Sequence, residues 1–184
     1  VWFTLRGIPV ETETEHDSGW ATALTQFRAV VKLKVVWLQA TVLVCAYSSY
    51  KAFDQYALFA VRGHGIDEID AAQIVTAGAW TRPIAALALG LLGDRFGISR
   101  MALVCFVLLI ISHSLFAFTG QALGSLSMIL LNTLVTGVAI FGLRGLYFGL
   151  LEEGQIPLAV TGTAVGLVSV IGYTPDVYVA AIAG

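Results

Sequence analysis

Residues 90–100 read GLLGDRFGISR, and this short charged stretch decides how the rest of the chain is interpreted. Apolar runs lie on either side of it, at residues 74–92 and 101–118. Each run has about the 17–25 residues that a helix needs to cross a lipid bilayer. Gly93 and Gly97 allow the chain to reverse tightly between the runs, because glycine adopts backbone angles closed to other residues. The stretch is therefore predicted to be a loop between two membrane-spanning helices.

The composition of the whole chain also indicates a membrane protein. Its 184 residues are 58% hydrophobic and only 12% charged, whereas an ordinary soluble domain is about 25% charged. A formal net charge of -2 argues against a nucleic-acid partner, which would require a basic face. Cys45 and Cys105 both lie inside apolar runs, so we interpret them as small hydrophobic residues rather than as a disulfide or metal pair.

The apolar runs predict an all-α integral membrane protein. Residues 35–184 are expected to form a helical bundle of about five transmembrane helices, at residues 35–61, 71–92, 101–118, 126–151 and 156–180. Residues 1–34 are expected to hold the end of a preceding helix, a cytoplasmic loop and an amphipathic helix on the membrane surface. Because the chain begins without Met and ends in an apolar run, we expect a fragment of a larger membrane protein.

The basic residues predict the orientation of these helices. They gather before the first span and in the loop after the second, at Arg6, Arg28, Lys32, Lys34, Arg95 and Arg100, whereas the opposite side has only Arg62. Cytoplasmic loops carry an excess of Lys and Arg. Residues 90–100 are therefore expected to face the cytoplasm, together with Glu152 and Glu153.

Charged residues within the predicted spans are the strongest candidates for function. A charge at the bilayer centre costs about 2.5–3.5 kcal/mol on insertion scales, so such residues generally face a protein interior or a water-filled cavity. Helical spacing places several of them on common faces with tyrosines, and arginine can bind a carboxylate or phosphate through two hydrogen bonds. We predict a cavity for a polar, anionic solute, lined by Tyr47, Tyr50, Lys51, Asp54, Trp80, Arg82, Arg144 and Tyr147.

Purely structural roles are the alternative for three of these residues. Lys51 and Asp54 are spaced to neutralise each other on one helix, and Lys51 is long enough to reach toward the membrane surface. Arg82 is placed to bind the carbonyl of Ala79, which Pro83 leaves without its helical partner.

Other motifs indicate helix packing rather than chemistry. Gly162 and Gly166 form a G-x-x-x-G motif, which allows two helix backbones to approach closely. His113, with serines on both sides, is expected to hydrogen-bond to another helix. The chain has no G-x-S-x-G, P-loop, H-E-x-x-H or C-x-x-C motif, so we do not expect an enzyme.

With the loop placed in the cytoplasm, residues 90–100 resemble the G-x-L-x-D-R-x-G signature of the major facilitator superfamily. The residues that match are Gly90, Leu92, Asp94, Arg95 and Gly97. The family usually has basic residues directly after the last glycine, whereas here Ile98 and Ser99 precede Arg100. The resemblance implies the C-terminal half of a twelve-helix transporter, that is, the central loop followed by helices seven to eleven. It also implies a gating role for Gly90, Asp94, Arg95, Gly97 and Arg100. In the family the Asp and Arg of this motif form a latch, with helix five as their usual partner, which implies that role for Asp94 and Arg95.

The resemblance further implies a secondary active transporter in the bacterial inner membrane, working by alternating access as a symporter or antiporter. Short segments are similar to bacterial members often grouped with nitrate or organic-anion carriers, at residues 80–83, 144–148, and 161–164 followed by 173–176. We expect no cofactor beyond a coupling proton or sodium ion. The expected partners are the lipid bilayer, a small-molecule solute and the missing N-terminal half of the same chain. The alternative is a transporter-like membrane sensor, which binds a solute without moving it.

Overall fold

The computed structural model describes residues 19–119 and 126–183 of the chain. The predicted end of a preceding helix and most of the cytoplasmic loop fall in residues 1–18 and lie outside the described residues. The described parts are helical and contain no strand. The helices are α1 (Gly19–Val31), α2 (Lys34–Phe53), α3 (Tyr56–His64), α4 (Glu68–Phe96), α5 (Ile98–Thr119), α6 (Leu126–Leu146), α7 (Gly149–Glu153), α8 (Leu158–Gly172) and α9 (Pro175–Ala183).

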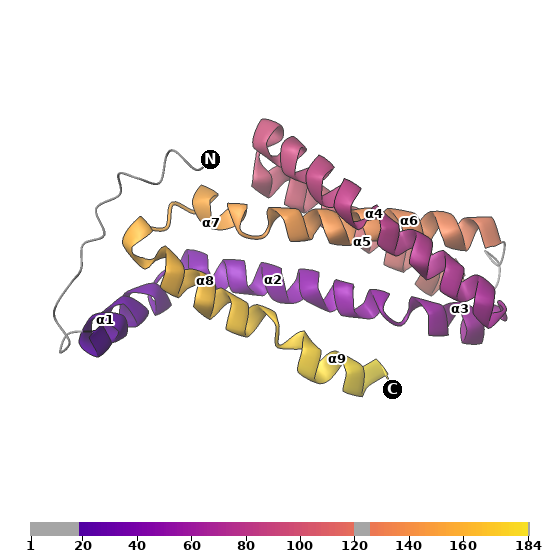
Figure 1. Cartoon of the computed structure of the whole chain (residues 1–184), viewed down its shortest axis with the longest axis horizontal. Helices are drawn as coiled ribbons and strands as arrows, with labels where there is room; N and C mark the ends of the chain where they lie inside the picture. Colours follow the sequence, from indigo (N-terminus) through magenta and orange to yellow (C-terminus); the bar gives the residue numbers. More distant parts are fainter. Residues whose placement is uncertain (1–18, 120–125, 184) are drawn as a thin grey trace, which may run out of the picture.

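The prediction of an all-α membrane bundle is confirmed. Within residues 19–119 and 126–183, four segments are long and apolar enough to cross a membrane: α4, α5, α6 and the segment Leu158–Val179, which joins α8 to α9. A fifth candidate is α1 with α2, which meet at an angle of 77°. Figure 1 shows the helices running back and forth along one long axis, with α3 continuing beyond α2.

Three of the predicted spans are interrupted helices in the structure. The first is divided into α2 and α3 at residues 54–55, the fourth into α6 and α7 at residues 147–148, and the fifth into α8 and α9 at residues 173–174. The second span is longer than predicted, because α4 has 29 residues. Asp67 caps its start by accepting a hydrogen bond from the backbone N–H of Ile69 (3.1 Å). Its end is at Gly97, whose φ of 97° favours glycine.

The closest packing in the bundle is between α4 and α6, where glycines bring the two backbones together. A Cβ atom added at Gly137 of α6 would lie only 3.0 Å from the carbonyl oxygen of Gly78 in α4. One added at Gly145 would lie 2.8 Å from the carbonyl oxygen of Ala86. Small residues permit this kind of approach between membrane helices.

The close packing predicted at Gly162 and Gly166 is not found among the described residues. A Cβ atom at either position would meet nothing within 4 Å. Helix α8 instead packs on α2 through Gly172, where an added Cβ would lie 2.2 Å from Leu43. The G-x-x-x-G spacing places two glycines on one face, but it does not determine which neighbour that face meets.

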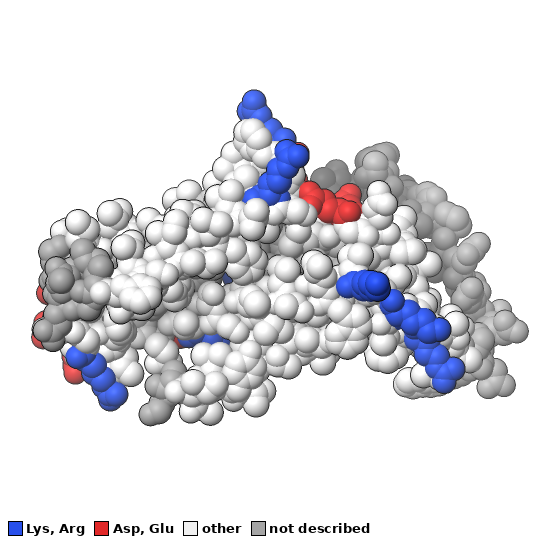
Figure 2. Space-filling view, turned by 180° about the vertical axis from the view of Figure 1, so that it is seen from behind, with Lys and Arg blue, Asp and Glu red and all other residues white. Residues whose placement is uncertain are grey.

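The surface suits a lipid environment. Figure 2 shows a broad face made almost wholly of uncharged residues, with Lys and Arg side chains gathered toward its edges. Large apolar side chains are exposed along the spanning helices, for example Ile84 at 72% and Ile110 at 65%. In water such a surface would be unfavourable, whereas lipid tails solvate it.

Candidate functional site

Two arginines from different helices lie on adjacent aromatic rings. The Arg82 guanidinium of α4 lies 4.7 Å from the ring centre of Phe141 in α6. The Arg144 guanidinium of α6 lies 4.8 Å from the ring centre of Tyr50 in α2. The two rings meet edge to face, with centres 6.3 Å apart. We call these four residues the arginine ledge; it joins α2, α4 and α6.

Neither arginine of the ledge is neutralised within the described part of the chain. The ion pairs found there all involve Lys51, and none involves Arg82 or Arg144. Both arginine side chains are exposed. Ring contacts orient a guanidinium by an attraction of about 0.5–2 kcal/mol, but they leave its N–H donors unused. The ledge therefore presents two positive charges with free donors.

The structural alternative for Arg82 does not match the geometry. Arg82 makes no hydrogen bond to the carbonyl of Ala79 among the described residues, although Pro83 does lie inside α4. The hydroxyl of Thr81 donates instead to the carbonyl of Gly78 at 2.6 Å. The guanidinium extends to the ring of Phe141.

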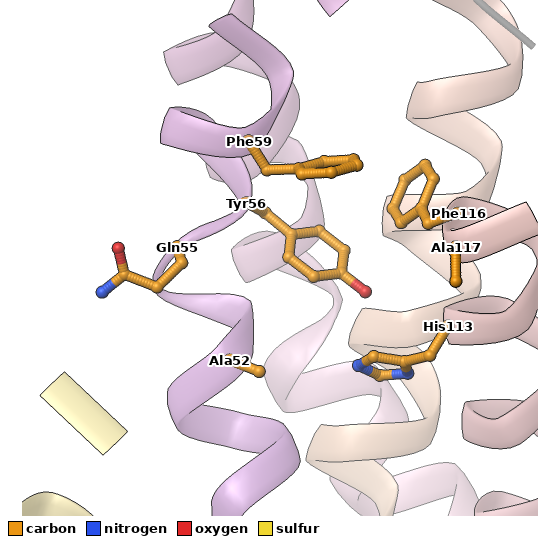
Figure 3. Close-up of a pocket in the computed structure, with 7 residues that line it drawn as sticks. All are labelled: Ala52, Gln55, Tyr56, Phe59, His113, Phe116 and Ala117. Atoms are coloured by element: carbon orange, nitrogen blue, oxygen red, sulfur yellow. The ribbon is translucent and has the colours of Figure 1, made fainter. Parts of the chain in front are cut away.

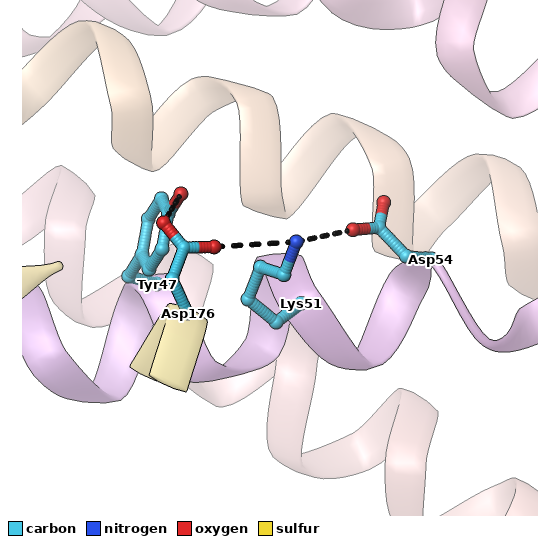
Figure 4. A network of polar contacts seen from close by, with 4 residues as sticks. All are labelled: Tyr47, Lys51, Asp54 and Asp176. Carbon is cyan, nitrogen blue, oxygen red and sulfur yellow. Dashed lines mark hydrogen bonds and ion pairs between the residues drawn. The ribbon is translucent and has the colours of Figure 1, made fainter. Parts of the chain in front are cut away.

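Beside the ledge, Lys51 is the centre of a second group of polar side chains (Figure 4). Its Nζ atom lies 3.0 Å from a carboxylate oxygen of Asp54 and 3.3 Å from one of Asp176. The hydroxyl of Tyr47 donates to the other oxygen of Asp176 at 2.9 Å. We call these four residues the lysine network. Lys51 is thus paired, as the structural alternative predicted, but with a carboxylate on α9 as well as one on its own helix.

Asp176 was not among the residues predicted from the sequence to line the cavity. Asp176 lies in the first turn of α9, directly after Pro175, and the ring of Tyr173 before it contacts that of Tyr47 (centres 4.8 Å apart). The signal in the sequence was an acidic residue immediately after a proline that restarts a helix. Its helix partner could not be read from spacing, because α2 is more than 120 residues away in the chain.

Neither Tyr147 nor Trp80 belongs to the arginine ledge. The N–H of Tyr147 still bonds to the carbonyl of Leu143 as in a helix (3.1 Å), and Tyr147 lies near enough to Arg144 to interact with it electrostatically. However, Tyr147 is only 4% exposed, and its hydroxyl has no hydrogen-bond partner among the described residues. Trp80 is 74% exposed and forms no ring contact with the described residues.

The break after α6 has a partner that the sequence did not reveal. The side chain of Gln39, only 4% exposed on α2, donates to the backbone carbonyl of Tyr147 at 2.5 Å. That carbonyl lies where α6 gives way to α7, and therefore lacks a regular helical partner. A buried amide thus satisfies a buried carbonyl at the break.

The prediction of a loop at residues 90–100 is wrong: α4 continues through Gly93 to Phe96 and α5 begins at Ile98, so only Gly97 lies between the two helices. This α4–α5 junction is held by Glu153, at the end of α7. The Glu153 carboxylate accepts hydrogen bonds from the backbone N–H groups of Ile98 (2.5 Å) and Ser99 (2.9 Å), and from the Ser99 hydroxyl. These are the first N–H groups of α5, where a negative charge is favoured. The bonds from Ser99 lower the pKa of Glu153 below its usual range, and the N–H of Ile98 and the charge of Arg100 add to the effect.

The predicted gating residues surround this contact without forming an ion pair in the described part of the chain. Arg95 lies over the ring of its neighbour Phe96, 5.5 Å from the centre. Gly97 supplies the positive φ that separates α4 from α5, and a Cβ at Gly90 would meet nothing within 4 Å. Asp94 is exposed.

A separate pocket of about 290 Å³ lies where α2 gives way to α3, facing α5 (Figure 3). Figure 3 shows the Tyr56 hydroxyl pointing toward α5 and Gln55 turned away. His113 borders the pocket, and its Nδ1 contacts the carbonyl of Leu109 on its own helix at 2.8 Å. The expected bond to another helix is not found among the described residues. The α5–α6 polar contacts are made by Ser112, which bonds to Asn132 and Thr136.

Within the described residues, no three His, Cys, Asp or Glu side chains are grouped so as to hold a metal ion. The apolar helices and the arginine ledge define the class of protein: it is a helical integral membrane protein with cationic side chains on its spanning helices.

The comparison with known proteins agrees with this class. The chain is 26% identical over 193 aligned positions to "Inner membrane protein YqcE" of Escherichia coli (strain K12). The match covers 100% of this chain and 44% of that protein, so the chain spans less than half the length of its relative. No protein-family profile matches the chain, and no solved structure is similar to it.

Proposed function

We propose that this chain forms one half of a secondary active transporter of the major facilitator superfamily, which moves a small anionic solute across the inner membrane by alternating access. The observation that carries the proposal is the arginine ledge. It places two arginines without carboxylate partners on adjacent rings of the bundle. Charged groups among membrane helices generally mark a solute or ion pathway.

The chemistry of the ledge favours an anion. Arg82 and Arg144 keep their N–H donors available, and a guanidinium binds a carboxylate or phosphate through two parallel hydrogen bonds. The rings beneath them hold the planes of the guanidinium groups in place before a solute arrives. Lys51 is occupied by Asp54 and Asp176, so we propose the two arginines, and not Lys51, as the groups that bind the solute.

The membrane fold and the relative support the rest of the proposal. The match to the E. coli inner membrane protein covers the full length of this chain, and that protein is more than twice as long as the chain. A transporter of two halves would place the second half against the ledge and bind the solute between them. The α4–α5 junction within residues 90–100 is proposed as part of the cytoplasmic gate, with Glu153 as its contact in this half. Moving a solute without altering it requires no catalytic residue.

The test is solute uptake by the full-length protein in lipid vesicles. Radiolabelled nitrate, gluconate and glucose 6-phosphate serve as probes, because each carries an anionic group that a guanidinium can bind. Arg82→Ala and Arg144→Ala are expected to lower uptake at least tenfold while the protein still inserts normally. Arg144→Lys keeps the positive charge but lacks the planar set of donors. Its uptake is expected to lie between that of Arg144→Ala and that of the wild type. Arg62→Ala is the matched control, because Arg62 lies on α3 and makes no contact with the ledge.

Uptake at wild-type rates by Arg82→Ala would overturn the role of the ledge. Binding of a probe without any flux would instead favour a transporter-like sensor, which senses the solute but does not move it. The two outcomes are separated by measuring equilibrium binding and vesicle uptake with the same protein preparation.

A further inference from the structure

The lysine network contains more negative charge than its single cation can neutralise. One ammonium, that of Lys51, lies within ion-pair distance of two carboxylates, at 3.0 Å from Asp54 and 3.3 Å from Asp176. With all three groups ionised, the network carries one excess negative charge. Tyr47 donates a hydrogen bond to Asp176 but adds no charge. One bound proton would make the network neutral.

The two carboxylates differ in what they join. Asp54 is three residues from Lys51 and directly follows the end of α2, so this pair stays together however the helices move. Asp176 belongs to α9, so the Lys51–Asp176 pair connects α9 to α2 (Figure 4). Breaking the second pair would leave Lys51 still paired with Asp54. The network can therefore release α9 without leaving Lys51 unpaired.

Both carboxylates lie at interruptions in membrane helices. Asp54 is at the break between α2 and α3, and Asp176 follows the break between α8 and α9 by two residues. Transporters commonly place coupling ions at interrupted helices, where an element can tilt about the break. The Lys51–Asp176 ion pair joins the end of α2, next to the first break, to the start of α9, next to the second.

The other ionisable groups around the network are tyrosines and one arginine. Tyr50 of α2 lies between Lys51 and Arg144, with their charged groups 6.0 Å and 4.8 Å from its ring centre. Tyr173, after α8, contacts the ring of Tyr47, and Tyr178 of α9 lies 3.4 Å from the hydroxyl of Ser48. Among the described residues, none of these supplies a second carboxylate partner for Lys51. Asp54 and Asp176 are the two carboxylates of this site within the described part of the chain.

We infer that Asp176 is the proton-coupling residue of the transporter, and that its protonation breaks the Lys51–Asp176 pair and frees α9 from α2. The inference rests on the proposed transport function and assigns the coupling ion to it. The step is a protonation: the carboxylate of Asp176 takes one proton from water and becomes a neutral carboxylic acid, while Lys51 keeps its charge and its pair with Asp54. The network passes from one excess negative charge to none. Because Tyr50 contacts both Lys51 and Arg144, the proton site adjoins the proposed solute site.

The test uses the full-length protein in vesicles with Asp176→Asn, which resembles the protonated acid in shape and charge. Driven accumulation of the probe anion under an imposed pH gradient is expected to fall at least tenfold. Exchange of labelled for unlabelled probe between equal concentrations is expected to stay within about twofold of wild type, because exchange needs no net proton movement. Asp70→Asn is the matched control, since Asp70 lies exposed in the first turn of α4, away from the network.

A second measurement uses the wild-type protein alone, so that the inference can be tested even if Asp176→Asn does not fold. Addition of the probe anion to vesicles with a pH-sensitive dye inside is expected to move protons together with the anion. Accumulation by Asp176→Asn at the wild-type level, wild-type transport without proton movement, or transport driven by sodium at constant pH would each overturn the inference. Absence of any exchange by the wild-type protein would instead overturn the transport function itself.

Discussion

The substitution Gly137→Ala tests whether α4 and α6 are as close as the structure shows. Gly137 is buried on α6, and the new methyl group would lie 3.0 Å from the Gly78 carbonyl oxygen and 2.9 Å from the Thr81 hydroxyl. Carbon atoms pack best at about 3.5–4.0 Å from their neighbours. The helices would therefore have to separate by roughly 0.5 Å at this crossing, because the contact at Gly78 is backbone and cannot rotate away.

The expected effect is a loss of stability by overpacking, which in well-packed cores costs about 1–3 kcal/mol. In the interior of a helix, alanine is also more stable than glycine by about 0.5–1 kcal/mol, and this gain would partly hide the loss. Gly162→Ala in α8 corrects for this gain, since its methyl group would meet nothing within 4 Å. The free energy of unfolding should thus be lower for Gly137→Ala than for Gly162→Ala by about 1–3 kcal/mol.

The measurement is reversible unfolding of the full-length protein in mixed micelles as the fraction of denaturing detergent rises. Both variants are compared with wild type at one protein concentration, and the amount inserted into membranes is recorded for each. Equal stability of the two variants would show that the α4–α6 crossing is looser than the structure has it.

Two further predictions concern the contacts at the cytoplasmic end and the break after α6. Glu153→Gln should lower the unfolding midpoint at pH 7. The folded-state pKa of Glu153 is depressed, so its contribution is complete above the ordinary pKa of 4.5 and is lost as pH falls through the lower folded value. The difference in unfolding midpoint between wild type and Glu153→Gln should therefore disappear in acid. A difference that did not change with pH would contradict the contact of Glu153 with Ser99. Gln39→Leu should cost about 1–3 kcal/mol, because it leaves the buried carbonyl of Tyr147 without its donor. Gln73→Leu on the exposed side of α4 is its control, and equal unfolding free energies for the two variants would contradict that role.

Several features of the fold could be predicted because they depend on local sequence. Whether a segment crosses a bilayer is decided mainly by its length and hydropathy, so the spans near α4, α5 and α6 were visible as apolar runs. The reversal between α4 and α5 was predicted from the glycines at 93 and 97, but only Gly97 takes a positive φ, and the predicted loop is confined to that residue. The pairing of Lys51 with Asp54 was the structural alternative to a role in the cavity, because a spacing of three residues brings side chains together on a helix.

The helix breaks were harder to predict because they depend on contacts made elsewhere. Pro157 and Pro175 mark helix starts, but residues 54–55 and 147–148 contain no proline or glycine. The carbonyl of Tyr147 is satisfied by Gln39 from another helix, and this contact makes the break after α6 tolerable. Spacing along one helix could not reveal that Tyr147 turns inward while Arg144 stays exposed.

The sequence by itself determined that this protein is a bundle of membrane helices with charged side chains inside its spans, because bilayer solvation acts on each segment separately. Only the tertiary structure decided which of those side chains meet. Arg82 and Arg144 lie on adjacent rings, and Asp176 reaches Lys51, because of how α2, α4, α6 and α9 are rotated and packed. That rotation is set by contacts between residues distant in the chain, such as the approach of Gly137 to Gly78, and no single segment encodes it.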